Sequence, residues 1–77
     1  MARYLVIIEA GERNYSAYVP DVPGCIATGT TRDEVLETMR EALAFHLEGM
    51  QQHGEVIPEP NSDPAFVDVN VPADAHA

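Results

Sequence analysis

Apolar and polar positions follow two different periods along the chain, and the change between them predicts where strands end and a helix begins. Residues 3–9, RYLVIIE, are apolar without a break from Tyr4 to Ile8. Such a run is typical of a strand buried on both faces and predicts a central place in a sheet. Residues 15–19, YSAYV, predict its antiparallel hairpin partner, and residues 25–29, CIATG, predict a short third strand.

The longest regular pattern covers residues 32–53 and predicts a helix of about six turns. Thr31 and Glu34 match a capping box at its start, and Gly54 is a natural C-terminal cap. Eight residues form one largely apolar stripe along the helix: Val35, Leu36, Met39, Ala42, Leu43, His46, Leu47 and Met50. The other side collects four acids, Glu34, Glu37, Glu41 and Glu48. Phe45 stands among these acids, away from the direction of the core.

The end of the chain predicts a return to the sheet. Residues 54–64 are rich in proline and turn formers, and residues 65–71, AFVDVNV, alternate as a half-exposed strand near an edge. Residues 72–77 predict a frayed tail. Two hairpins and a right-handed helical crossover then predict a mixed four-stranded sheet of order 3-2-1-4, with the helix on one face. The expected fold is therefore α+β, a β-β-β-α-β unit in a single domain over residues 1–77. A second copy of the chain is expected to cover the bare sheet face, as a homodimer or a higher oligomer.

The segment PDVPG, between the second and third predicted strands, predicts a stiff turn. Pro20 and Pro23 each fix a φ angle, and Gly24 can supply a positive φ. Cys25 follows and invites interpretation as a nucleophile. However, no base stands near it in sequence and the surrounding charge is acidic, which raises a thiol pKa. A small buried side chain is the favoured interpretation.

Charge narrows the classes of partner. Thirteen acids face four arginines, for a net charge of −9 over 77 residues. This field opposes binding to phosphate backbones and attracts basic proteins, although solubility alone is an equal explanation of it. No apolar run is long enough to span a membrane, and the N-terminus is typical of a strand rather than a signal peptide. A single cysteine permits no internal disulfide, which fits the cytoplasm.

Candidate catalytic groups are sparse. His46 and His53 stand seven positions apart, which is too far for one ion, and His76 lies in the predicted tail. The predicted topology also resembles the first half of the ribonuclease H fold, whose carboxylates bind metal. Asp68 with Glu41 or Glu48 could fill the later positions of that set, but the middle of strand one is LVII and Glu9 lies only at its end. We therefore expect no catalytic residue, metal or cofactor.

The turn and the residues around it resemble one known protein family. Residues 15–43, YSAYVPDVPGCIATGTTRDEVLETMREAL, closely resemble the HicB family, the antitoxins of HicAB toxin–antitoxin pairs. PDVPGC matches the family's turn, and GEVIPEP at residues 54–60 looks like its exit loop. Five further positions fit the family pattern: Gly29, Thr31, Glu34, Glu41 and Ala42. The resemblance extends from about Tyr4 to Val71.

The resemblance implies a partial ribonuclease H-like fold without nuclease chemistry. It also implies a function, which is to bind a small basic HicA-like toxin that cleaves mRNA and to block its RNA surface. Many HicB proteins continue into a DNA-binding domain, whereas this chain stops after the predicted fourth strand with no basic helix, so a short form without operator binding is expected. An orphan self-associating module and, further off, a small metal-dependent nuclease remnant are the alternatives.

The candidate functional residues have two predicted roles. The predicted partner contacts are Tyr18, Asp21, Pro23 and Phe45, with the surface acids Glu37, Glu41 and Glu48. Pro20, Gly24 and Cys25 are predicted to shape the turn.

Overall fold

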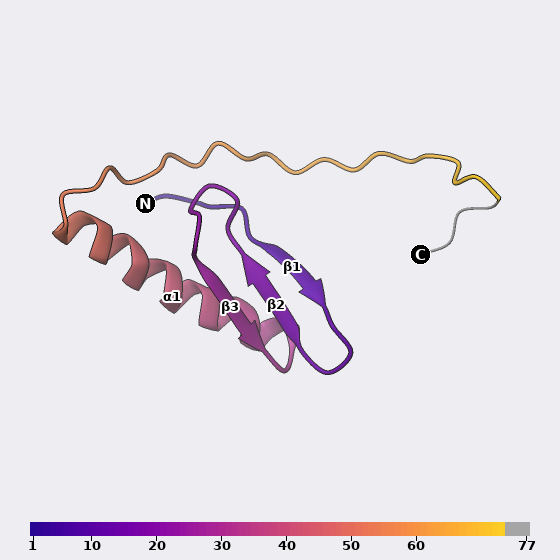
Figure 1. Cartoon of the computed structure of the whole chain (residues 1–77), viewed down its shortest axis with the longest axis horizontal. Helices are drawn as coiled ribbons and strands as arrows, with labels where there is room; N and C mark the ends of the chain where they lie inside the picture. The colour runs from indigo at the N-terminus through magenta and orange to yellow at the C-terminus, as the bar shows by residue number, and fades with distance from the viewer. Residues whose placement is uncertain (74–77) are drawn as a thin grey trace.

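Three strands and one long helix make up the body of the protein (Figure 1). The computed structural model describes residues 1–73. Strands β1 (Ile7–Ala10), β2 (Tyr15–Tyr18) and β3 (Ile26–Gly29) precede the helix α1 (Arg32–Gln52). Both strand pairs are antiparallel and the sheet order is β1-β2-β3, so β2 is central. The α+β class, the three-stranded meander and the helix are confirmed.

The fourth strand is not present in the part of the chain that the structure describes. The predicted mixed sheet of order 3-2-1-4 is wrong for the single chain, because residues 65–71 pair with nothing and the sheet is wholly antiparallel. Figure 1 shows these residues extended beyond the body of the molecule. The alternating pattern correctly indicates an extended segment, but such a pattern does not specify the strand's neighbour. The predicted tail, residues 72–77, lies partly outside the described residues.

β1 is an edge strand and not the predicted central one. Ile7 pairs with Tyr18, which is the last residue of β2. Two positions later Pro20 turns the chain away, and a proline has no N–H to offer a ladder. Residues 3–6 consequently have no strand opposite them, which explains why the regular strand begins at Ile7 and not at residue 3.

The core lies between one face of the sheet and α1, which packs on β3 and β2 (Figure 1). Seven buried residues form it: Ala17, Val19, Val22, Cys25, Ala27, Val35 and Met39. Leu43 and Leu47 of the predicted stripe are half-buried against them. Gly29 permits the close approach of the helix, because a Cβ there would stand 2.7 Å from the backbone nitrogen of Val35.

The caps at Thr31 and Gly54 are confirmed, but the Glu34 carboxylate bonds to Thr30, one residue before its predicted capping-box partner. The N–H of Glu34 donates to Oγ1 of Thr31 (3.0 Å), and the Glu34 carboxylate accepts from the N–H and hydroxyl of Thr30. These two bonds from Thr30 lower the pKa of Glu34. At the other end Gly54 has a φ of 72°, and the N–H of Glu55 donates to the carbonyl of Met50 (2.9 Å) as in a Schellman motif.

Candidate functional site

The PDVPG turn consists of two consecutive tight turns. The N–H of Val22 donates to the carbonyl of Val19 (3.1 Å), and the N–H of Cys25 donates to the carbonyl of Val22 (3.3 Å). Pro20 and Pro23 each occupy the second position of one turn, where their fixed φ suits the geometry. In the second turn Gly24 follows with a φ of 87°, the combination that defines type II. Every third side chain here is buried, so the turn is fixed from inside and its two prolines face outward.

The carboxylate of Asp21 anchors the segment that leaves the helix. It accepts hydrogen bonds from the N–H of Asn61 (3.0 Å) and from the N–H and hydroxyl of Ser62 (2.9 Å each). The backbone N–H of Ser62 is the largest cause of a lowered pKa at Asp21. The Tyr4 hydroxyl adds a second tie by donating to the carbonyl of Pro58 (2.6 Å). Residues 58–62 are thereby held across the end of the sheet.

An acidic stripe surrounds one exposed aromatic ring on the outer side of α1. Glu37, Glu41, Phe45 and Glu48 follow at intervals of four, four and three positions, which places them on one helix face. The Phe45 side chain is 78% exposed. Glu37 also pairs with Arg40 (2.7 Å), and both side chains are largely exposed, so this ion pair adds little stability.

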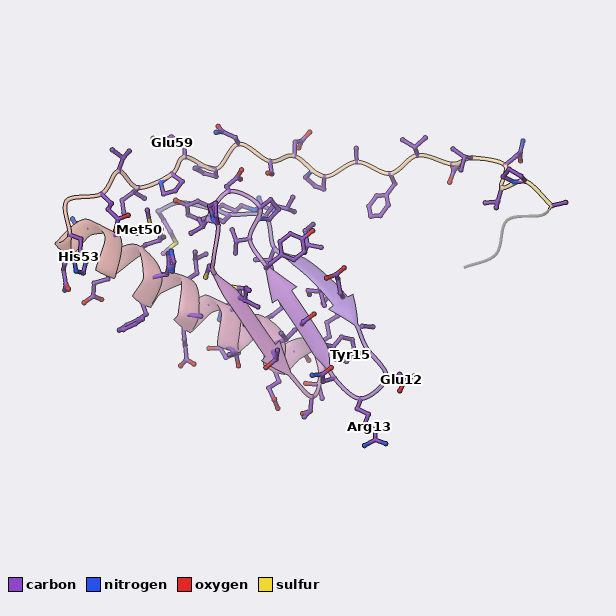
Figure 2. The ribbon with its side chains drawn as sticks, in the orientation of Figure 1. Glu12, Arg13, Tyr15, Met50, His53 and Glu59 are labelled. Carbon is purple, nitrogen blue, oxygen red and sulfur yellow. The ribbon has the colours of Figure 1, made fainter. Side chains whose placement is uncertain are left out.

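A shallow groove joins this ring to the turn. Its walls come from the turn, the second half of α1 and the exit segment: Pro23, Phe45, His46, Gly49, Met50 and Glu55. Figure 2 shows Met50 and His53 at the C-terminal end of the helix, far from Glu12 and Arg13 at the tip of the β1–β2 loop. Its walls are mainly apolar, with His46 and Glu55 as the polar members, and this groove forms the candidate site.

The sheet face turned away from α1 is open. The register places Ile7, Tyr18 and Ile26 side by side across the three strands. Tyr18 is 43% exposed and Ile26 is 67% exposed. This apolar row is the partly bare face that the sequence predicts.

The candidate groups Cys25 and His53 occupy structural positions. Cys25 is buried with its Sγ 3.7 Å from Sδ of Met39, and burial raises its thiol pKa, as expected of a structural side chain. The Nδ1–H of His53 donates to the carbonyl of Gly49 (2.7 Å), which ties this side chain to the last turn of the helix. Within residues 1–73 no three His, Cys, Asp or Glu side chains gather to hold a metal, and Asp68 stands on the extended segment. His76 lies outside the described residues.

The predicted partner residues fall in three places. Pro23, Phe45 and the three acids meet at the groove and the helix face. Tyr18 belongs to the open sheet face, and Asp21 serves the exit segment within the chain. Sequence reasoning missed Met50 as a wall of the groove, because its place in the apolar stripe pointed to the core. It also missed Ile26, although alternation along CIATG already sets Ile26 opposite the buried Cys25 and Ala27.

The described residues include no helix that is both long enough and apolar enough to span a bilayer.

Comparison with protein families matches most of the chain. The model of the HicB-like antitoxins of bacterial toxin–antitoxin systems matches residues 4–71. This range includes the turn, the helix, the exit segment and the extended segment.

Individual relatives and a solved structure agree with that match. A protein of Haemophilus phage HP1 is 41% identical over 58 residues, which are 75% of this chain but only 44% of the phage protein. A UPF0150 protein of Thermoplasma acidophilum is 37% identical over 62 residues, which are 79% of this chain and 90% of that protein. One chain of a solved HicA3 and HicB3 toxin–antitoxin complex superposes with a TM-score of 0.69 and 31% identity, covering 79% of this chain and 71% of that one.

Proposed function

Because the chain belongs to the HicB-like antitoxin family of bacterial toxin–antitoxin systems, we propose that it binds and neutralises a small basic, mRNA-cleaving toxin of the HicA type. Binding covers the RNA-contacting surface of the toxin, and the chain itself contributes no catalytic step and no nucleic-acid contact. Since mRNA is the toxin's substrate, the encounter takes place in the cytoplasm.

The observation that carries this proposal is Phe45, exposed within a stripe of glutamates. Exposed aromatic side chains that enter a partner's pocket supply much of the energy of protein interfaces. The acids on either side complement a basic RNA-binding surface, and a net charge of −9 accelerates the approach of a basic partner. The similar chain in the HicA3 and HicB3 complex comes from a toxin–antitoxin pair, which supports the same type of partner.

We assign the contact surface to the groove and the helix face. Pro23 stands on a turn fixed by two internal hydrogen bonds, so little conformational entropy is lost when it is contacted. Phe45 provides the anchor, and Glu37, Glu41 and Glu48 provide charge complementarity. Tyr18 belongs to a separate surface on the open sheet face, where the apolar row favours self-association as a homodimer. A self-associating module without a toxin is the second candidate function, and that row is the observation in its favour.

The test begins with affinity capture by the full-length chain at moderate salt, with each retained protein identified by mass spectrometry. A retained small basic protein is then purified and assayed for mRNA cleavage with and without an equimolar amount of this chain. We expect cleavage to stop at equimolar ratio. A retained protein that keeps cleaving RNA, or recovery of the chain alone, contradicts the toxin proposal and leaves the self-associating module.

Phe45→Ser provides the residue-level test, with Phe66→Ser as the matched control. Both rings are exposed, at 78% and 99%, and the substitution is the same. Loss of the Phe45 anchor is expected to raise the Kd for the toxin at least about tenfold, which corresponds to about 1.4 kcal/mol. Phe66→Ser is expected to leave that Kd unchanged. Equal effects of the two variants on the Kd would show that the helix face is not part of the interface.

A further inference from the structure

We propose that residues 65–71 complete the sheet of a second copy of the chain, by adding as a fourth strand to the free edge of that copy's β1. The exchange is reciprocal, so each copy gives one strand and receives one. The inference rests on the proposed homodimer and not on toxin binding.

The extended segment has the properties of a strand without a neighbour. Its residues alternate, with Val67, Val69 and Val71 on one side and Phe66, Asp68 and Asn70 on the other. Phe66 is 99% exposed, and Val67, Val69 and Val71 are 82%, 73% and 69% exposed. Three exposed valines on one side of a segment that pairs with nothing indicate an interaction surface on a monomer.

β1 offers an unprotected edge. Among residues 1–73 its outer edge has no ladder partner, and Glu9 is the only charged residue of the strand. Natural edge strands are often blocked by lysine, proline or a bulge, and β1 carries none of these, so its protection is limited to Glu9 and to a length of four residues. The half-buried residues 4–6 continue the strand outward with the apolar character of a chain meant to have neighbours on both sides. A strand that is added here would pair along both stretches.

The anchor at Asp21 fixes where the free strand starts. Ser62 is held at the end of the sheet, and the chain beyond it runs off the body (Figure 1). Residues 63–71 span about 30 Å when extended, at about 3.3 Å per residue. That length exceeds the four residues of β1, which span about 13 Å. The segment therefore reaches across a neighbouring molecule while its own origin stays fixed.

The exposed surface area exceeds that of a compact monomer. The molecule exposes 6508 Å², whereas a compact monomer of its 8.4 kDa exposes about 4,600 Å². Its radius of gyration is 15.5 Å, against about 11.5 Å for a compact chain of this length. A specific interface buries about 800 Å² of each partner, so the excess is sufficient for one.

A second copy is favoured over any other occupant because the chain carries both halves of the contact. A two-fold dimer covers the strand and the edge of each copy at once. A different protein added to β1 would leave residues 65–71 bare, and one that captured residues 65–71 would leave β1 open.

Isotope-mixed NMR tests the exchange on the full chain. One half of the sample is labelled with ¹³C and ¹⁵N and the other half is unlabelled, so that filtered NOE spectra report only contacts between copies. We expect such contacts between residues 65–71 and β1, in a species of roughly twice the mass of the 8.4 kDa chain. A dimer without these contacts, or one whose residues 65–71 contact their own β1, overturns the exchange but keeps the homodimer. A monomer overturns both.

Val69→Asp and Val56→Asp form the matched pair of variants. Both valines are exposed, at 73% and 86%, and only Val69 lies on the exchanged strand. Val69→Asp is expected to raise the dimer Kd at least tenfold by sedimentation velocity while circular dichroism retains the helix signal. Val56→Asp is expected to keep the wild-type Kd. An unchanged Kd in Val69→Asp, or an equal rise in both variants, overturns the proposal.

Discussion

Asp21 and Ser62, 41 positions apart in the chain, are joined by two hydrogen bonds of 2.9 Å, one from the Ser62 N–H and one from its hydroxyl. The stiff turn therefore does more than present Pro23 to the groove. Its acid also fixes the point from which the C-terminal segment leaves the body, and both proposed interfaces depend on that geometry.

Asp21→Asn is expected to release the exit segment and spare the rest of the fold. The amide keeps one acceptor oxygen for the two backbone N–H groups, and its NH2 group can donate to the Ser62 hydroxyl, but the charge that strengthens these bonds is lost. Amide hydrogen exchange at Asn61 and Ser62 should accelerate at neutral pH, with exchange in α1 unchanged. Ser62→Ala is the partner control and should produce a smaller acceleration. Unchanged exchange at Ser62 in Asp21→Asn would contradict the anchor.

The same anchor predicts an acid-dependent release. The pKa of Asp21 lies below its ordinary value of 3.8, chiefly because the Ser62 N–H stabilises the carboxylate. A lowered folded pKa contributes stability that is complete above the unfolded value and is lost as pH falls through the folded one. The Ser62 amide resonance should therefore stay constant from pH 7 to about 5 and shift only below pH 3.8. A midpoint above 3.8 would contradict the hydrogen-bonded carboxylate.

Local sequence signals predicted the local structure well. Thr31, Glu34 and Gly54 act within one turn of the backbone, so both helix caps could be predicted from residue type alone. The same holds for Pro23 and Gly24, whose order specifies the turn. Burial of Val35 and Met39 followed from helical period, because that period is set by geometry within the helix.

Long-range partners could not be predicted in the same way. The apolar run from Tyr4 to Ile8 indicates neighbours on both sides but does not say which chain supplies the second one. The single chain leaves that place empty. Asp21 was predicted as a partner contact because an exposed acid in a rigid turn suits a basic ligand. Its hydrogen bonds to Ser62 depend on the path of the exit segment. The pattern of apolar and polar residues does not predict that path.

Gly24 is expected to tolerate asparagine far better than valine. A Cβ at this position would meet nothing within 4 Å, so only the backbone φ of 87° opposes a side chain. Valine is disfavoured there by about 1–3 kcal/mol, whereas asparagine enters the left-handed region at lower cost. Urea unfolding at fixed protein concentration should show Gly24→Val as the less stable of the two. Equal stabilities would mean that the turn is not rigid.

Gly29→Ala and Gly49→Ala are expected to change stability in opposite directions. At Gly29 the new Cβ would stand 2.7 Å from the backbone nitrogen of Val35, so the start of α1 must shift away from β3 at a cost of about 1–3 kcal/mol. At Gly49, inside α1, a Cβ meets nothing within 4 Å and helix propensity favours alanine by about 0.5–1 kcal/mol. Thermal unfolding of both variants at equal protein concentration should give a lower Tm than wild type for Gly29→Ala and a higher Tm for Gly49→Ala. A neutral Gly29→Ala would show that the helix approach is not tight.

The double variant Glu41→Gln/Glu48→Gln tests whether the helix face guides the toxin. Removing two charges beside Phe45 should lower the association rate constant for the toxin by about 3–10-fold at low salt, with a smaller change in the dissociation rate. The difference should vanish near 0.5 M salt, where the Debye length is only about 4 Å. Glu9→Gln/Glu12→Gln removes the same charge at β1 and at the β1–β2 loop. Figure 2 shows Glu12 far from Met50 in the wall of the groove. Stopped-flow measurements across a salt series should give different association rate constants for the two double variants. Electrostatic steering depends on where the charge lies as well as on the net charge. Identical salt slopes would show that only net charge matters, and the acidic stripe would then have no part in recognition.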